Sequence, residues 1–164
     1  MENSPEHDPL TMILEVFQQE KEADLAARFG EKGFRVWRDA PKRQRLVSPT
    51  VVGTVKGSCG DTISIALDIS GDTIIQTDFD TDGCASSQIA AATAAALARH
   101  KTLDEAVDIA DKDIINEIGM FPDADRHCAY LAAAAVREAV HRWMIQHADL
   151  LPATAPKDSR EAKA

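Results

Sequence analysis

Residues 50–79 read TVVGTVKGSCGDTISIALDISGDTIIQTDF, and this stretch decides the fold class. Between 63 and 69 every second residue is Ile or Leu, which is the period of a half-buried β-strand. The sequence SGD at 70–72 indicates a turn, and a second strand pattern follows it at 73–79. Together with the strand expected at 51–55, this pattern predicts three short strands with tight connections, an antiparallel meander.

Residues 9–29 are predicted to form an amphipathic helix ahead of the sheet. Gly30 stands where the C-terminus of that helix is expected, and residues 31–49, with two prolines and a basic cluster, are predicted to be a connecting loop. The apolar face of the helix is spaced at i, i+3, i+4 and i+7, and its residues are Leu10, Ile13, Leu14 and Phe17.

Everything after Gly83 is predicted to be helical. A Thr-Leu-Asp-Glu capping box at 102–105 opens one helix, and Gly119 closes another. A sheet followed by helices indicates an α+β fold: a three-stranded antiparallel sheet with a layer of C-terminal helices and an N-terminal helix. We expect a flexible N-terminus (1–8), a single domain (9–150) and a disordered tail (151–164). The predicted C-terminal helices cover 85–99, a short segment from 102, 111–118 and a longer segment after Cys128.

Charge and apolar content argue against several classes of protein. The net charge of −9 argues against nucleic acid as a partner, because phosphate binding requires a basic surface. The longest apolar stretch, around 89–98, is too short to cross a bilayer, so no membrane association is expected. The first residues are acidic and lack the hydrophobic run of a secretory signal, which predicts a cytoplasmic location.

Three cysteines without an export signal predict free thiols, not a disulfide framework. Cys59, Cys84 and Cys128 each lie at a junction between predicted elements, and the first two have glycines beside them. Cys84 and Cys128 stand at the predicted starts of helices, where unpaired N–H groups and the helix dipole favour an anion. This placement predicts lowered thiol pKa values and ready formation of thiolates.

The meander predicts that the three cysteines meet. Cys59 lies in the turn between the first two strands and Cys84 follows the third strand, so both loops belong to one edge of the sheet, and Cys128 can approach from the helical half. Convergent thiolates suit an iron–sulfur cluster, zinc or a cuprous ion. The spacings of 25 and 44 residues, without a CxxC pair, are not those of a zinc finger or a ferredoxin. Asp61 or His127 is left to complete the site, and a carboxylate ligand predicts a labile one.

At these residues the sequence resembles the IscU/NifU-type iron–sulfur cluster assembly scaffolds of the NifU N-terminal-like family. The matching pieces come in the family's order and span roughly residues 50–142. They are Val52-Gly53 leading to Cys59-Gly60-Asp61, Thr81-Asp82-Gly83-Cys84 with its Ser/Ala-rich helix, KTLDEA at 101–106, and His127-Cys128-Ala129 before a helix ending in AVREA.

The resemblance implies a scaffold and not an enzyme. A cysteine desulfurase would deliver sulfur as a persulfide, a ferredoxin-type donor would supply electrons, and the finished 2Fe–2S cluster would pass to recipient apo iron–sulfur proteins. Carried over by position, Cys59, Cys84 and Cys128 are cluster ligands, and Asp61 tunes cluster stability and release. His127 is an alternative ligand and Cys128 the persulfide acceptor. Zinc is implied in the same site when no cluster is bound.

The sequence departs from the family pattern at one segment, and it leaves alternative functions open. The segment FPDAD at 121–125 replaces a basic recognition residue by an acidic one, which puts release by an Hsp70-type chaperone in doubt. The nearest alternative function is zinc-dependent persulfide transfer of the SufU type, but the gap of 44 residues and the presence of His127 favour the scaffold. A closed structural metal site, or a thiol hydrolase, are further alternatives.

Overall fold

The computed structural model describes residues 8–148. Strands β1 (Val51–Lys56), β2 (Thr62–Ser70) and β3 (Thr73–Thr81) form an antiparallel sheet in the order β1-β2-β3. This confirms the predicted meander and the α+β fold, whereas residues 1–7 and the predicted tail at 151–164 lie outside the described residues. The helices are α1 (Pro9–Asp39), α2 (Ala85–Ala98), α3 (Leu103–Val107), α4 (Asp111–Ile118) and α5 (Arg126–Gln146), with 3-10 turns η1 (Ala40–Lys42) and η2 (Asp123–Asp125).

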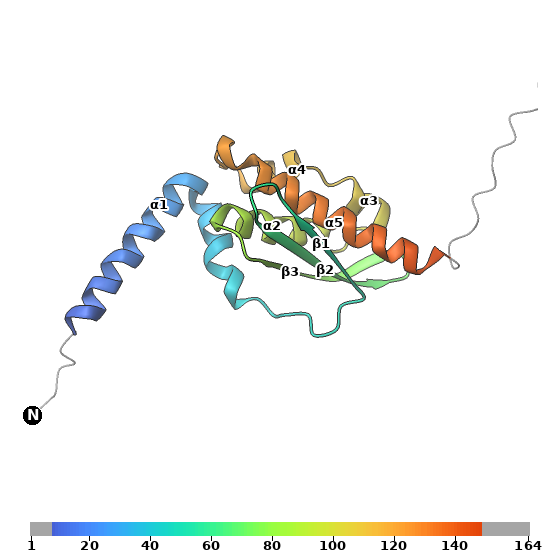
Figure 1. Ribbon diagram of the computed structural model, residues 1–164, viewed down its shortest axis with the longest axis horizontal. Helices are drawn as coiled ribbons and strands as arrows, with labels where there is room; N and C mark the ends of the chain where they lie inside the picture. The colour runs from blue at the N-terminus through green and yellow to red at the C-terminus, as the bar shows by residue number, and fades with distance from the viewer. Residues whose placement is uncertain (1–7, 149–164) are drawn as a thin grey trace, which may run out of the picture.

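The core lies between one face of the sheet and the helices α2 and α5 (Figure 1). The alternating residues Ile63, Ile65 and Leu67 are fully buried there, as their period of two predicted. Helix α5 crosses β1 so closely at Gly53 that a Cβ atom on this residue would overlap backbone atoms of the helix. Gly53 is therefore required for the close approach of strand and helix.

The strand register brings the cysteine-bearing loops to one edge of the sheet. Lys56 pairs with Thr62 across β1 and β2, and Ile63 pairs with Thr81 across β2 and β3. The turn between β1 and β2 and the exit from β3 therefore lie side by side, as predicted. The β2–β3 turn, with Gly71 at φ +65°, is at the opposite end of the hairpin.

The predicted loop at 31–49 is wrong over its first part. Gly30 has φ +67°, a conformation that favours glycine and ends a helix, but a second helical stretch resumes at once and runs to Asp39, followed by η1. The chain resumes the helix because Phe29 and Gly33, on either side of the kink, are both buried. Only residues 43–50 form an irregular connection to β1.

None of the helices within residues 8–148 has the length and apolar character needed to cross a lipid bilayer.

Candidate metal centre

The turn after β1 positions Cys59 and Asp61. Its backbone is closed by a hydrogen bond of 2.8 Å from the Gly57 N–H to the Asp61 carbonyl and by one of 3.1 Å from the Gly60 N–H to the Gly57 carbonyl. Gly60 has φ +96°, which only glycine adopts without strain. The turn leaves the Cys59 side chain exposed and directs Asp61 toward the start of α2.

Cys84 is the N-cap residue of α2, and its thiol is exposed. The preceding Gly83 leaves room for Asp61, because a Cβ atom here would overlap Asp61 Oδ2 and lie 2.6 Å from Ser87 Cβ. The Ser87 hydroxyl, fully buried in the first turn of α2, donates a hydrogen bond of 2.6 Å to Asp61 Oδ2. Asp61 is thereby held beside Cys84.

Cys128 lies in the first turn of α5 and is only 1% exposed. The pKa of this thiol is raised to about 11, and burial is the largest cause. A hydrogen bond with Ser87 lowers the pKa, whereas the nearby Cys84, Asp125 and Asp61 add to the increase. The predicted lowering of the Cys128 pKa by the helix N-terminus is therefore wrong. Desolvation of the thiolate outweighs the helix dipole there, and a bound cation would reverse that balance.

The structure brings Asp61, Cys84 and Cys128 together, with one donor atom from each lying within 4.8 Å of the other two. Such a separation lets a single metal ion or one edge of a small cluster contact all three atoms, and two soft sulfurs with one carboxylate oxygen suit zinc or iron. Within residues 8–148, Cys59 and His127 are outside this compact group.

Cys59 and His127 instead line a neighbouring cavity of about 230 Å³, together with Tyr130 and Leu131. The His127 ring connects the cavity to the compact group, since its Nε2 lies 3.5 Å from the Cys128 sulfur and its Nδ1 lies 3.1 Å from the Ala124 carbonyl oxygen. Three of the five predicted site residues therefore form the compact group. The other two, Cys59 and His127, line the cavity beside it.

Sequence reasoning missed two residues that hold the site, Ser87 and Asp125. Asp125 Oδ2 accepts a hydrogen bond of 2.6 Å from the Ser86 hydroxyl and forms an ion pair of 3.0 Å with Arg28 of α1. These contacts tie the turn before α5 to both α1 and α2. The signal in the sequence was the pair of serines at the start of an otherwise alanine-rich helix, because buried hydroxyls require partners.

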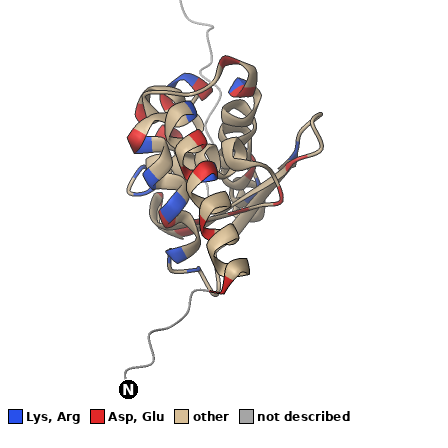
Figure 2. Cartoon of the chain, turned by 90° about the vertical axis from the view of Figure 1, so that its left-hand side faces the viewer, with Lys and Arg blue, Asp and Glu red and all other residues tan. Residues whose placement is uncertain are grey.

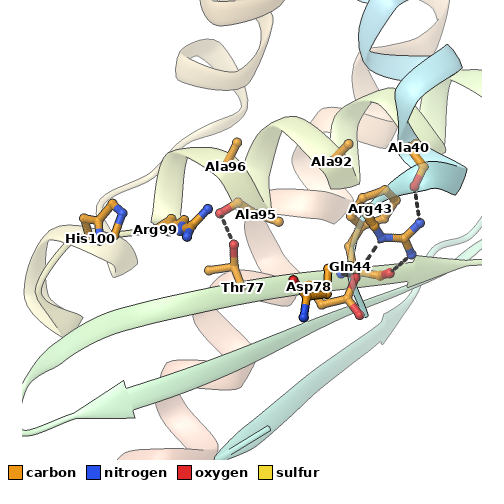
Figure 3. A pocket seen from close by; sticks show the side chains of 11 residues that line it. Ala40, Arg43, Gln44, Thr77, Asp78, Ala92, Ala95, Ala96, Arg99 and His100 are labelled. Atoms are coloured by element: carbon orange, nitrogen blue, oxygen red, sulfur yellow. Dashed lines mark hydrogen bonds and ion pairs between the residues drawn. The ribbon is translucent and has the colours of Figure 1, made fainter. Parts of the chain in front are cut away.

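A second cavity, of about 500 Å³, lies at the other end of α2 (Figure 3). Its wall contains the buried Asp78, whose Oδ1 accepts a hydrogen bond of 2.7 Å from Arg43 Nε. Burial would raise the pKa of Asp78, but hydrogen bonds from Arg43 and from the N–H groups of Phe79 and Leu46 hold it below its ordinary value. This pair fastens the 43–50 connection to β3 and is remote from the thiols.

Comparisons with known proteins identify the family of the chain. The family model described as the NifU-like N terminal domain matches residues 38–149. The chain is 33% identical over 102 residues to the iron–sulfur cluster assembly protein IscU of Plasmodium falciparum, covering 62% of this chain and 61% of that one. It is 27% identical over 133 residues to the nitrogen fixation protein NifU of Nostoc, covering 80% of this chain and 40% of that one.

Solved structures show the same fold. A protein described as an iron–sulfur cluster assembly scaffold for the SUF system, from Fervidobacterium islandicum, superposes with a TM-score of 0.56 at 20% identity, covering 70% of this chain and 98% of that one. The N-terminal part of a NifU-like protein from Brucella abortus gives 0.53 at 18% identity, covering 71% and 94%. The chain spans 40% and 61% of the two curated relatives described above, and the family model covers most of the chain. The chain therefore belongs to the family of NifU-like N-terminal domains.

Proposed function

We propose that this domain is a scaffold on which a 2Fe–2S cluster is assembled and from which it is passed to apo-proteins. The observation that carries the proposal is the compact group of Asp61, Cys84 and Cys128, with Cys59 at its border, in a member of a family whose named relatives include iron–sulfur cluster assembly proteins. In the proposal the three thiolates bind the cluster and Asp61 supplies the remaining position. The cluster is cargo, so a weak fourth ligand favours its release.

Sulfur would arrive as the persulfide of a cysteine desulfurase. The Cys128 thiolate attacks the outer sulfur, the donor's S–S bond breaks, and the donor thiolate leaves while Cys128 carries the persulfide. His127, with Nε2 3.5 Å from the Cys128 sulfur, is positioned to accept the thiol proton. Because Cys128 is buried, this step also requires the first turn of α5 to open toward the donor.

Reduction of the persulfide sulfur requires electrons from both ferrous iron and an external reductant. Two persulfide sulfurs need four electrons to become two sulfides; oxidation of two ferrous ions supplies two of them, and a ferredoxin-type donor supplies the other two. The product is the oxidised 2Fe–2S cluster, which then passes to a recipient apo-protein. Once the cluster has left, the three cysteines are again thiolates and Asp61 is unchanged.

The test is anaerobic assembly with ferrous iron, cysteine, a reductant and a cysteine desulfurase, followed by transfer to an apo-ferredoxin. We expect visible absorption to appear and then to move to the ferredoxin, and Cys59→Ser, Cys84→Ser and Cys128→Ser each to prevent it. Asp61→Ala should keep the cluster and slow its transfer. Assembly that proceeds normally in the Cys84→Ser and Cys128→Ser variants would refute the proposed ligand set.

A second candidate is zinc-dependent persulfide transfer of the SufU type. The observation that favours it is the compact set of one carboxylate and two sulfurs, which also suits a single tetrahedral zinc ion. It predicts a stoichiometric zinc ion that survives the assembly reaction, with persulfide formed on one thiol and no cluster. Zinc analysis before and after assembly, with mass spectrometry of the persulfide, distinguishes the two functions.

A further inference from the structure

The connection between α4 and α5 packs against α1 beside the kink at Gly30 (Figure 1). Phe29, which is fully buried, contacts Phe121 of this connection edge to face, with 5.5 Å between the ring centroids. A Cβ atom built on Gly30 would lie 3.5 Å from Met120 Cβ, so the kink lies directly beside the connection. The chain is therefore held against α1 just before α5 begins.

Asp125 joins three helices at the end of this connection. Its Oδ2 atom accepts a hydrogen bond of 2.6 Å from the Ser86 hydroxyl of α2 and one of 3.0 Å from Arg28 Nη2 of α1. Asp125 directly precedes α5, yet its side chain makes no capping hydrogen bond to that helix. We call Arg28, Asp125 and Ser86 the Asp125 bridge, because together they tie the start of α5 to α1 and to α2.

The Asp125 bridge differs from an ordinary surface ion pair. Acidic and basic residues are interspersed over the helices (Figure 2), and a pair between exposed side chains contributes little to stability. Lys32 of α1 and Glu117 of α4 form such a pair, with 2.7 Å between Nζ and Oε1 and both side chains 49% exposed. In the bridge the Asp125 side chain is 21% exposed and Ser86 is fully buried, so breaking it leaves a buried hydroxyl without its charged acceptor.

The bridge spans the two helical turns that enclose Cys128. This residue is 1% exposed and lies in the first turn of α5, three residues after Asp125. Its sulfur is within 4.8 Å of the sulfur of Cys84, the N-cap residue of α2. Separation of the first turns of α2 and α5 would uncover the Cys128 thiol, and the same movement would stretch the hydrogen bond from Ser86 to Asp125.

We propose that Asp125 is a positioning residue that keeps the Cys128 thiol enclosed until a sulfur donor acts; this inference rests on the proposed function. The Asp125 carboxylate touches no reacting atom and acts only through the position of Cys128. With the bridge intact the two turns stay together, and the thiol and its persulfide are shielded from small thiols and oxidants in solution. With the bridge broken, the first turn of α5 opens more often and Cys128 reacts faster.

The test measures how fast N-ethylmaleimide labels each cysteine of the full chain, freed of metal by a chelator, using mass spectrometry of the peptides. Asp125→Ala removes the acceptor of a buried hydroxyl, and we expect Cys128 to react roughly tenfold to a hundredfold faster. Ser86→Ala removes the same hydrogen bond but leaves no unpaired hydroxyl, so the increase should be about threefold to tenfold. The exposed Cys59 and Cys84 are internal references, and their rates should stay within about twofold of wild type.

Arg28→Gln separates positioning from a direct effect of charge. Loss of a positive charge near a thiol disfavours the thiolate and would slow its alkylation, whereas release of the bridge should speed it about twofold to fivefold. Arg28→Lys keeps a cation opposite Asp125 and should restore the wild-type rate. The matched control, Lys32→Gln, removes an ion pair of the same helix outside the bridge and should leave the labelling rate of Cys128 unchanged.

The dependence on urea distinguishes local opening from a general loss of stability. Opening of one helical turn exposes little surface, so labelling of Cys128 should change little at low urea, whereas labelling through global unfolding rises steeply. Three results would each overturn the proposal: Asp125→Ala and Ser86→Ala variants that label like wild type, an equal increase in Lys32→Gln, or a steep urea dependence of the added rate.

Chemical assembly separates failure of this inference from failure of the proposed function. With sodium sulfide and ferrous iron, wild type and the Asp125→Ala variant should both form a cluster, because the variant keeps all of the proposed ligands. Absence of a cluster in wild type would refute the proposed function, whatever the labelling rates are. A normal cluster together with unaltered labelling of Cys128 in the bridge variants would overturn the role of Asp125 alone.

Discussion

Replacing Gly83 by alanine should disturb the metal centre without replacing any of the residues that supply its donor atoms. The added Cβ would overlap Asp61 Oδ2 and lie 2.6 Å from Ser87 Cβ, where ordinary contacts between carbons are about 3.5–4.0 Å. Ser87 is fixed in the first turn of α2, so Asp61 must move, and its 2.6 Å hydrogen bond from the Ser87 hydroxyl is broken.

The cost combines two effects of known size. Overpacking at a buried contact destabilises by about 1–3 kcal/mol, and leaving a buried hydroxyl without its charged partner costs about 1–3 kcal/mol more. Since part of the clash is relieved when Asp61 turns toward solvent, we expect the free energy of unfolding to fall by about 2–4 kcal/mol in total. Zinc should also bind less tightly, because Asp61 leaves the donor group.

Urea unfolding and a competitive zinc titration measure the two effects. Gly71→Ala is the matched control: its Cβ would meet no atom within 4 Å, so it carries only the conformational penalty of φ +65°, about 1 kcal/mol, and leaves zinc affinity unchanged. In an Asp61→Ala background the cost of Gly83→Ala should fall by roughly half, because one of the two overlapping groups is gone. A Gly83→Ala variant as stable as wild type, with the same zinc affinity, would show that the packing of Asp61 against α2 is wrong.

Three further predictions concern the frame around the site. Gly53→Ala should cost about 3 kcal/mol in urea unfolding, because its Cβ would lie 2.7 Å from Ala139 Cα and overlap the helix backbone; a cost below 1 kcal/mol would contradict the close approach of β1 and α5. Asp78→Asn should cost about 2–3 kcal/mol at pH 7. The pKa of Asp78 is lowered in the folded state, so its contribution is complete above the ordinary value of 3.8 and is lost as the pH falls through the lower folded value. The gap between variant and wild type in urea midpoint should therefore narrow, and not widen, as the pH is taken below 3.8. Thr102→Ala removes a capping box in which Thr102 accepts a hydrogen bond from the Glu105 N–H and should lower the free energy of unfolding by about 1 kcal/mol, whereas an unchanged midpoint would mean that α3 does not depend on its cap.

The sheet could be predicted because its signals are local. The alternation at 63–69 specifies a buried face, and Gly71 marks a turn that requires positive φ. The capping box at Thr102 and the helix stop at Gly119, with φ +89°, were equally direct. Each of these signals depends on the backbone preferences of a few adjacent residues, so no tertiary information was needed.

The errors arose where tertiary packing decides. Gly30 does end a helix, but the helix resumes because Gly33 and its neighbours fit against α4 and the core, and the sequence does not say what they will meet. The thiol of Cys128 was expected to ionise easily because of its place at a helix start, yet its burial depends on the packing of α5 against α2 and raises its pKa. The spacing of Leu10, Ile13, Leu14 and Phe17 correctly predicted an apolar face of α1, but not that this face is exposed among the described residues.

Mössbauer spectroscopy of the full chain after desulfurase-driven assembly with enriched iron, together with iron and acid-labile sulfide analysis, tests the central claim most directly. If Cys59, Asp61, Cys84 and Cys128 together bind one exchangeable 2Fe–2S cluster, iron and sulfide will be equimolar and the spectrum will be that of such a cluster. An apo-ferredoxin will then remove the cluster from the chain. A single metal ion without sulfide, retained in the presence of the apo-ferredoxin and unaffected by Cys84→Ser and Cys128→Ser, would contradict the account.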